Sequence, residues 1–372
     1  MKVVIVGAGV AGLAIGWRLA QAGCEIEVID RGLAGRGASW AAAGMLAAIS
    51  ETGTDDSAHS RFAEDARAAW PAFVREIEEV SSEKIGYREP GALLVAFEEA
   101  QEARLRQLGE TLAAKQMPGE WLNAAEARKR EPLLSPNLRG ALLAKDSAQV
   151  DNRALCHALA IAFQKSGGQL REHCLAQLLI AENDHARGVV VDDAILFADA
   201  VIIAGGAWCN WLRGMPREVL PPVRPVKGQM VSLKPVNGAK LPQYPVWESD
   251  VYIVPRRDCV LIGATVEEAG FDTAVTKEAR DWLIAGAVKL APSLADWSVT
   301  ESWAGLRPAT PDGLPALGLT GLDGLFIATG QFRNGILFAP VVADALRRFV
   351  LGEEISPTLR AFDPRRFLRG LN

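Results

Sequence analysis

The first residues of the chain change from a continuous apolar run to apolar side chains at helical spacing. Residues 2–6 are mostly β-branched and apolar, which is typical of a parallel strand buried on both faces. Over residues 10–21 the apolar positions recur at the period of a helix, and Gly23 follows where a helix C-cap belongs. Residues 25–29 indicate a second strand, which ends at Asp30. The pattern therefore predicts a strand–helix–strand unit.

Strand-like and helix-like patterns alternate through the rest of the chain. Fully apolar runs predict buried strands at 200–204 and 325–328, and alternating runs predict antiparallel strands at 226–233, 251–255 and 260–264. Further strands are predicted at 91–97, 169–180 and 188–191. Helices are predicted at 61–80, 99–114, 153–165 and 280–290, and a final helix is predicted to end at about residue 351. Asn123 and Glu126 have the spacing of a capping box, which predicts the start of another helix.

The turn between the first strand and the first helix carries the spacing of a dinucleotide-binding motif. Gly7 suits the tight turn, Gly9 lets the backbone approach a pyrophosphate, and Gly12 lets the helix pack closely on the strand. The pyrophosphate would lie on the helix N-terminus, near Val10 and Ala11, where unpaired N–H groups and the helix dipole favour an anion. A glycine-rich turn that binds nothing would be the simpler alternative, but it leaves Asp30 unexplained.

Asp30 indicates which dinucleotide is bound. It lies eighteen residues beyond Gly12, where a carboxylate accepts hydrogen bonds from a ribose 2′-OH. An NADP site would favour a cation at this position. Because Arg31 follows directly, the sequence disfavours an NADP site but does not exclude it. Arg31 is therefore also expected to contact the cofactor.

The distribution of strand types predicts an α/β fold with two domains. Parallel-type strands lie near both ends and around residue 200, whereas antiparallel-type strands fill the gaps. We expect a discontinuous, Rossmann-type cofactor domain of residues 1–85, 146–220 and 304–372. The inserted substrate domain, an α+β unit on an antiparallel sheet, would comprise residues 86–145 and 221–303.

Composition narrows the classes of function. The 372 residues carry a net charge of −5 without a basic stripe, which argues against a nucleic-acid partner. Four histidines and five scattered cysteines show no metal-ligand spacing, and the odd cysteine number suits a reducing cytoplasm. We expect no bound metal and no membrane span, because no apolar segment is long enough.

Several later segments have the composition of ligand-binding loops. Gly205 follows the strand at 200–204, where α/β sheets place ligands. Arg333 stands between Gly330 and Gly335, and a guanidinium matches a carboxylate bidentately; the alternative is a surface arginine paired with an acid. The segment 35–46 is rich in small residues, which suits either backbone lying against a flat ligand or an alanine-rich helix.

Arg307 and Tyr252 are less specific signals. We expect Arg307 on a loop before Pro308, where it binds a carboxylate or instead bonds loop carbonyls. Tyr252 lies in an alternating strand, where a tyrosine often serves packing alone.

With these residues in view, the chain resembles the D-amino-acid-oxidase-like flavoenzymes and is most similar to the thiamine-biosynthetic glycine oxidases. The resemblance runs from Lys2 to about Gly352, and residues 55–145 match only in general pattern. Its specific parts are the 7–12 motif with Asp30 and the segments 38–46, 303–308, 310–313 and 332–337.

The resemblance implies a set of FAD contacts and a catalytic set. The catalytic set would be Arg307, Arg333, Tyr252 and Met45. The FAD contacts would be Gly7, Gly9, Val10, Ala11, Gly12, Asp30, Arg31, Ala38, Ser39, Ala43, Gly44, Met45, Ala176, Gly205, Gly330, Gln331, Phe332, Arg333, Asn334, Gly335, Ile336 and Leu337. Backbone N–H groups of residues 334–337 would face the negative charge of the reduced flavin. The FAD would be non-covalent, because no cysteine follows Cys259, whereas some sarcosine-oxidising relatives tether the flavin through a later cysteine.

The implied reaction is FAD-dependent oxidation of glycine, sarcosine or a small D-amino acid. Hydride transfer would give an imino acid, then a keto acid and ammonia, with O₂ reduced to peroxide. The alternatives are a D-amino-acid or secondary-amine dehydrogenase that uses an electron carrier, and a flavin-holding subunit with little activity alone. Two positions depart from the family, Asp250 and Val266, and both bear on pocket size. A homo-oligomer is left open.

Overall fold

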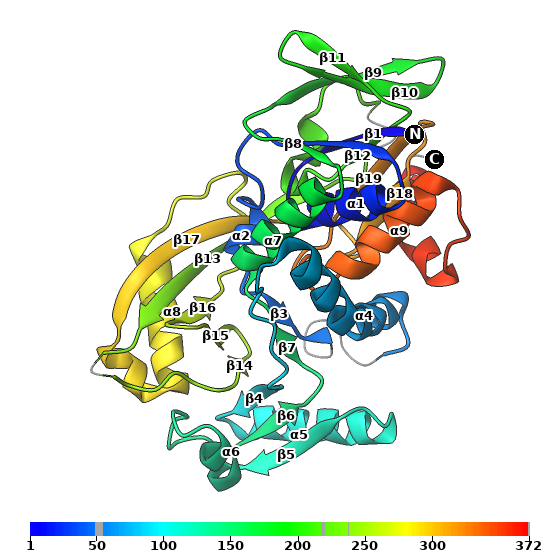
Figure 1. Ribbon diagram of the computed structural model, residues 1–372. Coiled ribbons are helices and arrows are strands. Elements are labelled where there is room, and N and C mark those ends of the chain that lie inside the picture. Colours follow the sequence, from blue (N-terminus) through cyan, green and yellow to red (C-terminus); the bar gives the residue numbers. More distant parts are fainter. Residues whose placement is uncertain (49–54, 217–219, 237, 371–372) are drawn as a thin grey trace.

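A computed structural model describes residues 1–48, 55–216, 220–236 and 238–370 (Figure 1). One sheet has six strands in the order β18-β19-β12-β1-β2-β8. They are β1 Lys2–Val6, β2 Glu25–Ile29, β8 Gln169–Arg171, β12 Ala200–Ile203, β18 Ala316–Leu319 and β19 Leu325–Thr329. Every neighbouring pair is parallel except β18 with β19. The strands predicted at the two ends and near residue 200 therefore form one sheet, which confirms the Rossmann-type prediction.

Both faces of this sheet are buried, which explains the unbroken apolar run of β1. Val3 and Ile5 belong to one hydrophobic core with residues of the helices α1 Val10–Gln21, α4 Ala58–Ser81, α7 Asn152–Lys165 and α9 Ala339–Leu351. Val4 points to the opposite face and packs against a three-stranded antiparallel sheet of β9 Ala176–Glu182, β10 His185–Val191 and β11 Ala194–Phe197. Because neither face meets solvent, β1 shows no alternation of polar and apolar residues.

The parallel strands bring several distant segments to one edge of the sheet. The carboxyl ends of parallel strands share an edge, so the turn at Gly7 after β1, Asp30 after β2, Gly205 after β12 and Gly330 after β19 lie along it. The first and last of these positions, Gly7 and Gly330, are more than three hundred residues apart in the sequence. The fold thereby places the predicted glycine turns where α/β sheets bind ligands.

A second sheet has eight strands in the order β17-β13-β16-β15-β14-β4-β6-β5. They are β4 Ala92–Ala96, β5 Gly119–Asn123, β6 Gly140–Ala144, β13 Arg224–Lys234, β14 Val246–Glu248, β15 Val251–Pro255, β16 Val260–Gly263 and β17 Ser298–Ala309. All neighbours are antiparallel except β14 with β4. The three antiparallel runs predicted from alternation are β13, β15 and β16, so the prediction of an antiparallel sheet is confirmed.

The remaining elements are short or lie on the surface. They are α2 Ala38–Ala41, α5 Glu99–Ala114, α6 Ala124–Arg130, α8 Lys277–Leu290, β3 Met45–Leu46, β7 Ala148–Gln149 and the 3₁₀ helices η1 Gly206–Trp211, η3 Pro292–Asp296, η4 Pro357–Phe362 and η5 Pro364–Gly370. The capping box before α6 is present, with Asn123 accepting from the amides of Ala125 and Glu126. Within the described ranges, no helix is long and apolar enough to cross a membrane.

The prediction that Arg307 lies on a loop is wrong. Arg307 lies in β17, which pairs along its length with β13, and Pro308 faces Pro225 in that ladder. Gly305 and Pro308 are typical loop residues, which is why the sequence pattern did not indicate a strand here. β17 is the edge strand of its sheet, and an edge strand tolerates a residue without an N–H group.

A buried hydrogen bond joins α4 to the turn before α9. Trp70 is fully buried on α4, and its Nε1 donates to the carbonyl oxygen of Leu337 at 2.9 Å. Its ring also meets Phe73 edge-on and stacks on Tyr87. The bond therefore holds the 331–337 turn against the helical layer.

We predict that Trp70→Phe lowers the free energy of unfolding by about 1–3 kcal/mol, because the Leu337 carbonyl would stay buried without a donor. Urea denaturation measures this. Trp282→Phe is the matched control, since Trp282 is 45% exposed on α8. Equal stability of the two variants would contradict the prediction.

Candidate active site

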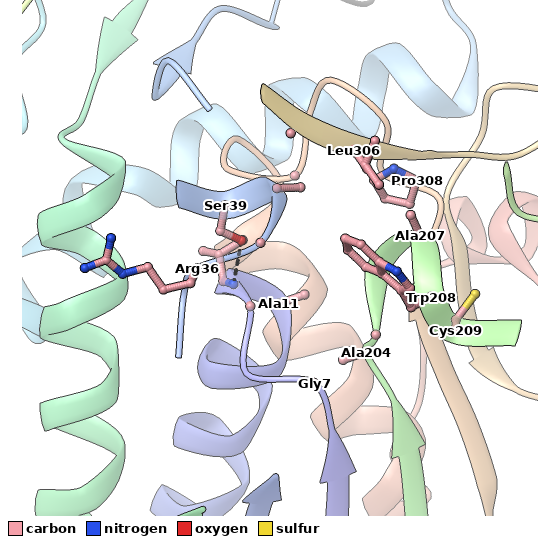
Figure 2. A pocket seen from close by; sticks show the side chains of 18 of the residues that line it. Gly7, Ala11, Arg36, Ser39, Ala204, Ala207, Trp208, Cys209, Leu306 and Pro308 are labelled. Carbon is pink, nitrogen blue, oxygen red and sulfur yellow. Dashed lines mark hydrogen bonds between the residues drawn. The ribbon is translucent and has the colours of Figure 1, made fainter. Parts of the chain in front are cut away.

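One cavity of about 760 Å³ follows the carboxyl edge of the six-stranded sheet and continues onto the second sheet. Its wall includes the Gly7 turn, the loops after β2 and β12, residues of β13, β15 and β17, and the 331–336 turn. Such a volume is typical of sites for small molecules and cofactors. The cavity thus joins the two sheets at a single site, seen from close by in Figure 2.

The Gly7 turn is built around close backbone contacts. Gly7 has φ +111°, and a Cβ there would lie 2.5 Å from the carbonyl oxygen of Ala204. A Cβ on Gly12 would lie 1.9 Å from the carbonyl oxygen of Gly7, so helix and turn touch directly. The Val10 amide donates to Ser39 Oγ at 2.9 Å, which ties α2 to the start of α1 (Figure 2). Only glycine fits these contacts, as the motif predicts.

Asp30 organises the same edge through its carboxylate. One oxygen accepts from the amide of Ala8 and the other from the amide of Gly32, each at 2.8 Å. A carboxylate has further acceptor sites on both oxygens, so a ribose hydroxyl can still bind. The Arg31 guanidinium lies 4.3 Å above the Trp208 ring, a cation–π contact rather than a phosphate site. These positions support NAD-type or FAD-type ribose recognition over NADP.

The segment 38–46 contains both structures that its small residues predicted, a short helix and a stretch of backbone along the cavity. It begins with α2 and continues as backbone along the cavity, with Gly44 at φ +65°. Arg256 Nη2 donates to the Ala43 carbonyl at 2.5 Å and to Asn152 Oδ1 at 3.1 Å. Burial lowers the pKa of the Arg256 guanidinium to about 10. These bonds anchor the cavity wall at residues 43–45 from the outside.

Arg307 is seated on the backbone of β13. A Cβ at Gly228 would lie 2.3 Å from the Arg307 guanidinium nitrogens, so the guanidinium occupies the place of a side chain. Arg307 Nη1 donates to the carbonyl oxygens of Thr265 at 3.1 Å and Lys227 at 3.3 Å. The carbonyl bonding considered as an alternative is present, and Arg307 also lines the cavity. The two roles are therefore compatible.

Tyr252 and Arg333 line the cavity from two further elements. Tyr252 is buried on β15, and its hydroxyl donates to the sulfur of Met230 at 3.4 Å. Arg333 is exposed in the turn before α9, and its side chain has no hydrogen bond or ion pair within the described residues. Within the described residues Arg333 is therefore not paired with an acid, which was the alternative considered from the sequence.

The cavity is cationic although the whole chain is acidic. The charged residues on its wall are five arginines and one acid: Arg31, Arg36, Arg213, Arg307, Arg333 and Asp30. The net charge of the whole chain is −5. Arginines gathered on one cavity in an acidic protein favour anionic groups such as a pyrophosphate or a carboxylate.

Most of the site residues expected from the sequence meet in this cavity. Those on its wall are Gly7, Gly9, Val10, Ala11, Asp30, Arg31, Ala38, Ser39, Ala43, Gly44, Met45, Ala176, Gly205, Tyr252, Arg307, Gln331, Phe332, Arg333, Gly335 and Ile336. Gln331 also carries a buried Nε2 without a hydrogen-bond partner, an unsatisfied donor beside the cavity. A glycine cradle, the free acceptor sites of Asp30 and this donor fit a dinucleotide cofactor.

Four expected residues lie behind the wall instead: Gly12, Gly330, Asn334 and Leu337. Gly12 packs on Gly7, and the carbonyl of Leu337 accepts from Trp70. The amide of Asn334 donates to the Gln331 carbonyl at 2.8 Å. That amide is therefore engaged within the turn, so it does not serve as the flavin-facing donor we expected.

Several residues that line the cavity were not expected from the sequence. Trp208 and Trp211 come from η1, and the Trp208 indole projects into the space between Gly7 and Pro308 (Figure 2). Gly228 and Met230 come from β13. A glycine inside a predicted strand marks a close approach of another group, so Gly228 was the available signal. Asp250 and Val266, the two departures from the family, are exposed and absent from the described wall.

The cysteines on the wall are poor nucleophiles. They are Cys174 and Cys209, and burial raises the pKa of both thiols, that of Cys209 to about 12. The thiolate is the reactive form, so these thiols stay protonated at neutral pH. This supports a cofactor held without a covalent bond.

Comparison with known proteins places the chain among flavoproteins. A family model described as "FAD dependent oxidoreductase" matches residues 2–348. Glycine oxidase of Pseudomonas aeruginosa is 33% identical, with 95% of each chain covered. The crystal structure of glycine oxidase from Geobacillus kaustophilus has a TM-score of 0.91 and 34% identity, covering 97% of this chain and 98% of that one.

A longer relative shares the same region. The bifunctional protein ThiO/ThiG of Trichormus variabilis is 35% identical over 98% of this chain. The chain spans about half of that relative, 55% of its length.

We predict that Asp30→Ala weakens FAD binding by about 1.5–3 kcal/mol, because a charge-assisted hydrogen bond to the ribose is lost. Titration of the apoprotein with FAD measures the dissociation constant. Asp193→Ala, an exposed acid in the turn after β10, is the control. An Asp30→Ala protein with unchanged affinity would show that other groups hold the ribose.

Proposed function

The chain belongs to the family of FAD dependent oxidoreductases, and we propose that it oxidises glycine or another small amino acid. The likeness to glycine oxidases over nearly the whole chain supports this substrate class. One observation carries the proposal: a single cavity is lined by both the Gly7 turn and the arginines Arg307 and Arg333. A cofactor and a small carboxylate can therefore bind side by side.

The residues of the cavity divide between these two ligands. The Gly7 turn, the start of α1 and Asp30 would hold the pyrophosphate and ribose of FAD. The backbone of residues 43–45, held by Arg256, and the 331–336 turn would hold the flavin. Arg333 would bind the substrate carboxylate together with Arg307, which is held by the carbonyls of Lys227 on β13 and of Thr265 after β16.

The chain contributes binding and orientation rather than a strong base. The bound FAD would supply the hydride acceptor for the substrate Cα–H, and its reoxidation by O₂ would give hydrogen peroxide. Clamping the carboxylate fixes which face of Cα is presented, and the apolar residues Met45, Leu306 and Phe332 exclude water. The imino acid released from the site hydrolyses to a keto acid and ammonia.

We extend the proposal to the setting of the reaction. Glyoxylate-level imine products would feed thiamine thiazole synthesis, and likeness to the bifunctional protein ThiO/ThiG supports this. The five cysteines are all unpaired, which supports a reducing cytoplasm. A homo-oligomer stays a proposal.

The two-domain division with boundaries at 1–85, 146–220 and 304–372 against 86–145 and 221–303 is also proposed. The two large sheets share no strand, which supports this division, although β17 runs across the 303/304 boundary.

The test of the function is peroxide formation by the purified protein with single substrates. We predict activity on glycine, with measurable activity on sarcosine and D-alanine, because a pocket separates substrates by one methylene with only about 1–3 kcal/mol. We expect none on L-phenylalanine. Faster turnover of L-phenylalanine than of glycine would overturn the substrate class. Glycine oxidation that needs an added electron carrier would favour the dehydrogenase, and no turnover under either condition would favour a flavin-holding subunit.

We predict that Arg333→Leu raises the KM for glycine by at least roughly 30-fold, the equivalent of about 2 kcal/mol for a lost charged partner. FAD content should stay unchanged, because in this proposal the Arg333 side chain meets the substrate carboxylate and not the cofactor. Arg104→Leu, an exposed arginine on α5 outside the cavity, is the control. A proportional loss of FAD in Arg333→Leu would mean that Arg333 acts on the cofactor instead.

A further inference from the structure

Lys227 is a buried cation on β13. The residue is 1% exposed, and its Nζ lies 2.8 Å from Asp272 Oδ2 and 3.9 Å from Glu267 Oε2. Both acids belong to the connection between β16 and α8, residues 264–276, which we call the strap. A buried ammonium is costly unless it is paired, so the pairing favours the strap in its observed position.

Gln229, two residues along β13, holds the strap by the same kind of contact. Its Nε2 donates to Glu267 Oε1 at 2.9 Å, and its Oε1 accepts from the amide of Thr276 at 2.8 Å. The backbones of Lys227 and Glu267 also exchange hydrogen bonds of 2.9 and 3.0 Å. The strap is thus fastened to β13 near its middle and at its end, although residues 271–276 are exposed.

The fastened strap supplies contacts to the cavity wall. The carbonyl of Thr265 accepts from Arg307 Nη1 at 3.1 Å, beside the Lys227 carbonyl at 3.3 Å. Farther along, the Phe271 ring lies 4.7 Å from that of Trp211 and 5.7 Å from that of Trp208, both of which line the cavity. The strap therefore touches the wall at the arginine and at η1.

We propose that Lys227 is a positioning residue, which anchors the strap so that the Thr265 carbonyl holds Arg307 in place for the substrate carboxylate. The inference rests on the proposed function, since it assumes that Arg307 meets that carboxylate. Lys227 does not line the cavity, so its side chain touches neither substrate nor cofactor. It acts through the strap, and its loss would weaken the hold on the Thr265 carbonyl and give Arg307 more freedom to move.

The test compares Lys227→Met with Lys234→Met in the FAD-loaded enzyme. Lys234 lies on the same strand and pairs with Asp258, but both side chains are half or more exposed and outside the cavity. Asp272→Asn changes the exposed partner of the buried pair, which keeps the test usable if Lys227→Met does not fold. The measurements are KM and kcat for glycine, the dissociation constants of acetate and of FAD, and the rate of proteolytic cleavage within residues 264–276.

We expect Lys227→Met to raise the KM for glycine and the dissociation constant of acetate by at least about tenfold, as misplaced binding groups do. kcat and the FAD dissociation constant should change much less, and strap cleavage should accelerate. Asp272→Asn should shift the same quantities in the same direction, and Lys234→Met should shift none. Unchanged acetate binding in Lys227→Met with faster strap cleavage would overturn the positioning role, as would an equal loss of FAD and acetate affinity.

The variant Arg307→Lys distinguishes failure of the proposed function from failure of the positioning role of Lys227. If Arg307→Lys leaves acetate binding and the KM for glycine unchanged, the carboxylate clamp is wrong whatever Lys227 does. If Arg307→Lys weakens acetate binding and Lys227→Met does not, the clamp stands and the positioning role falls. Acetate binding also decides the inference when glycine is not a substrate.

Discussion

The site depends on backbone-to-backbone contact between β1 and β12 at the carboxyl edge of the six-stranded sheet. Gly7 lies so close to the carbonyl of Ala204 that no side chain fits between the turn and the next strand. Gly12 closes the same contact from the helix side. Because these atoms touch directly, the N-terminus of α1 opens at the edge where Asp30 and the loops after β12 and β19 also end. A cofactor bound there meets four chain segments at once.

The second half of the site depends on the antiparallel sheet. β17 and β13 pair over their full length, so Arg307 crosses the backbone of β13 at Gly228. The missing side chain at 228 provides the space that the guanidinium fills. Two carbonyls hold one of its nitrogens, which lowers the entropy lost when the arginine binds an anion. Arg307, on a paired strand, is thus held more firmly than Arg333, which lies on a turn.

Electrostatics link the two halves. The chain is acidic, but its cavity gathers arginines from the loop after β2, from β17 and from the turn before α9. Anionic groups at both ends of the cavity, a pyrophosphate and a carboxylate, would balance this charge. The polar residues outside the cavity have a different task. Arg256 holds the backbone at Ala43, and Lys227 holds the strap, so these two cations support the walls without facing the ligands.

The sequence by itself determined the local features of this protein. The strand–helix–strand unit of residues 2–29, its glycine spacing, Asp30 and the capping box at Asn123 follow from patterns within about thirty residues. Tertiary structure alone decided that Arg307 lies on an edge strand, that its guanidinium rests on Gly228, and that Lys227 is buried. The Lys227–Arg307 bond joins residues 80 apart, and neither the hydrophobic period nor turn chemistry carries information about such a pairing. Strand pairing is decided by which faces bury each other, a property of the whole fold.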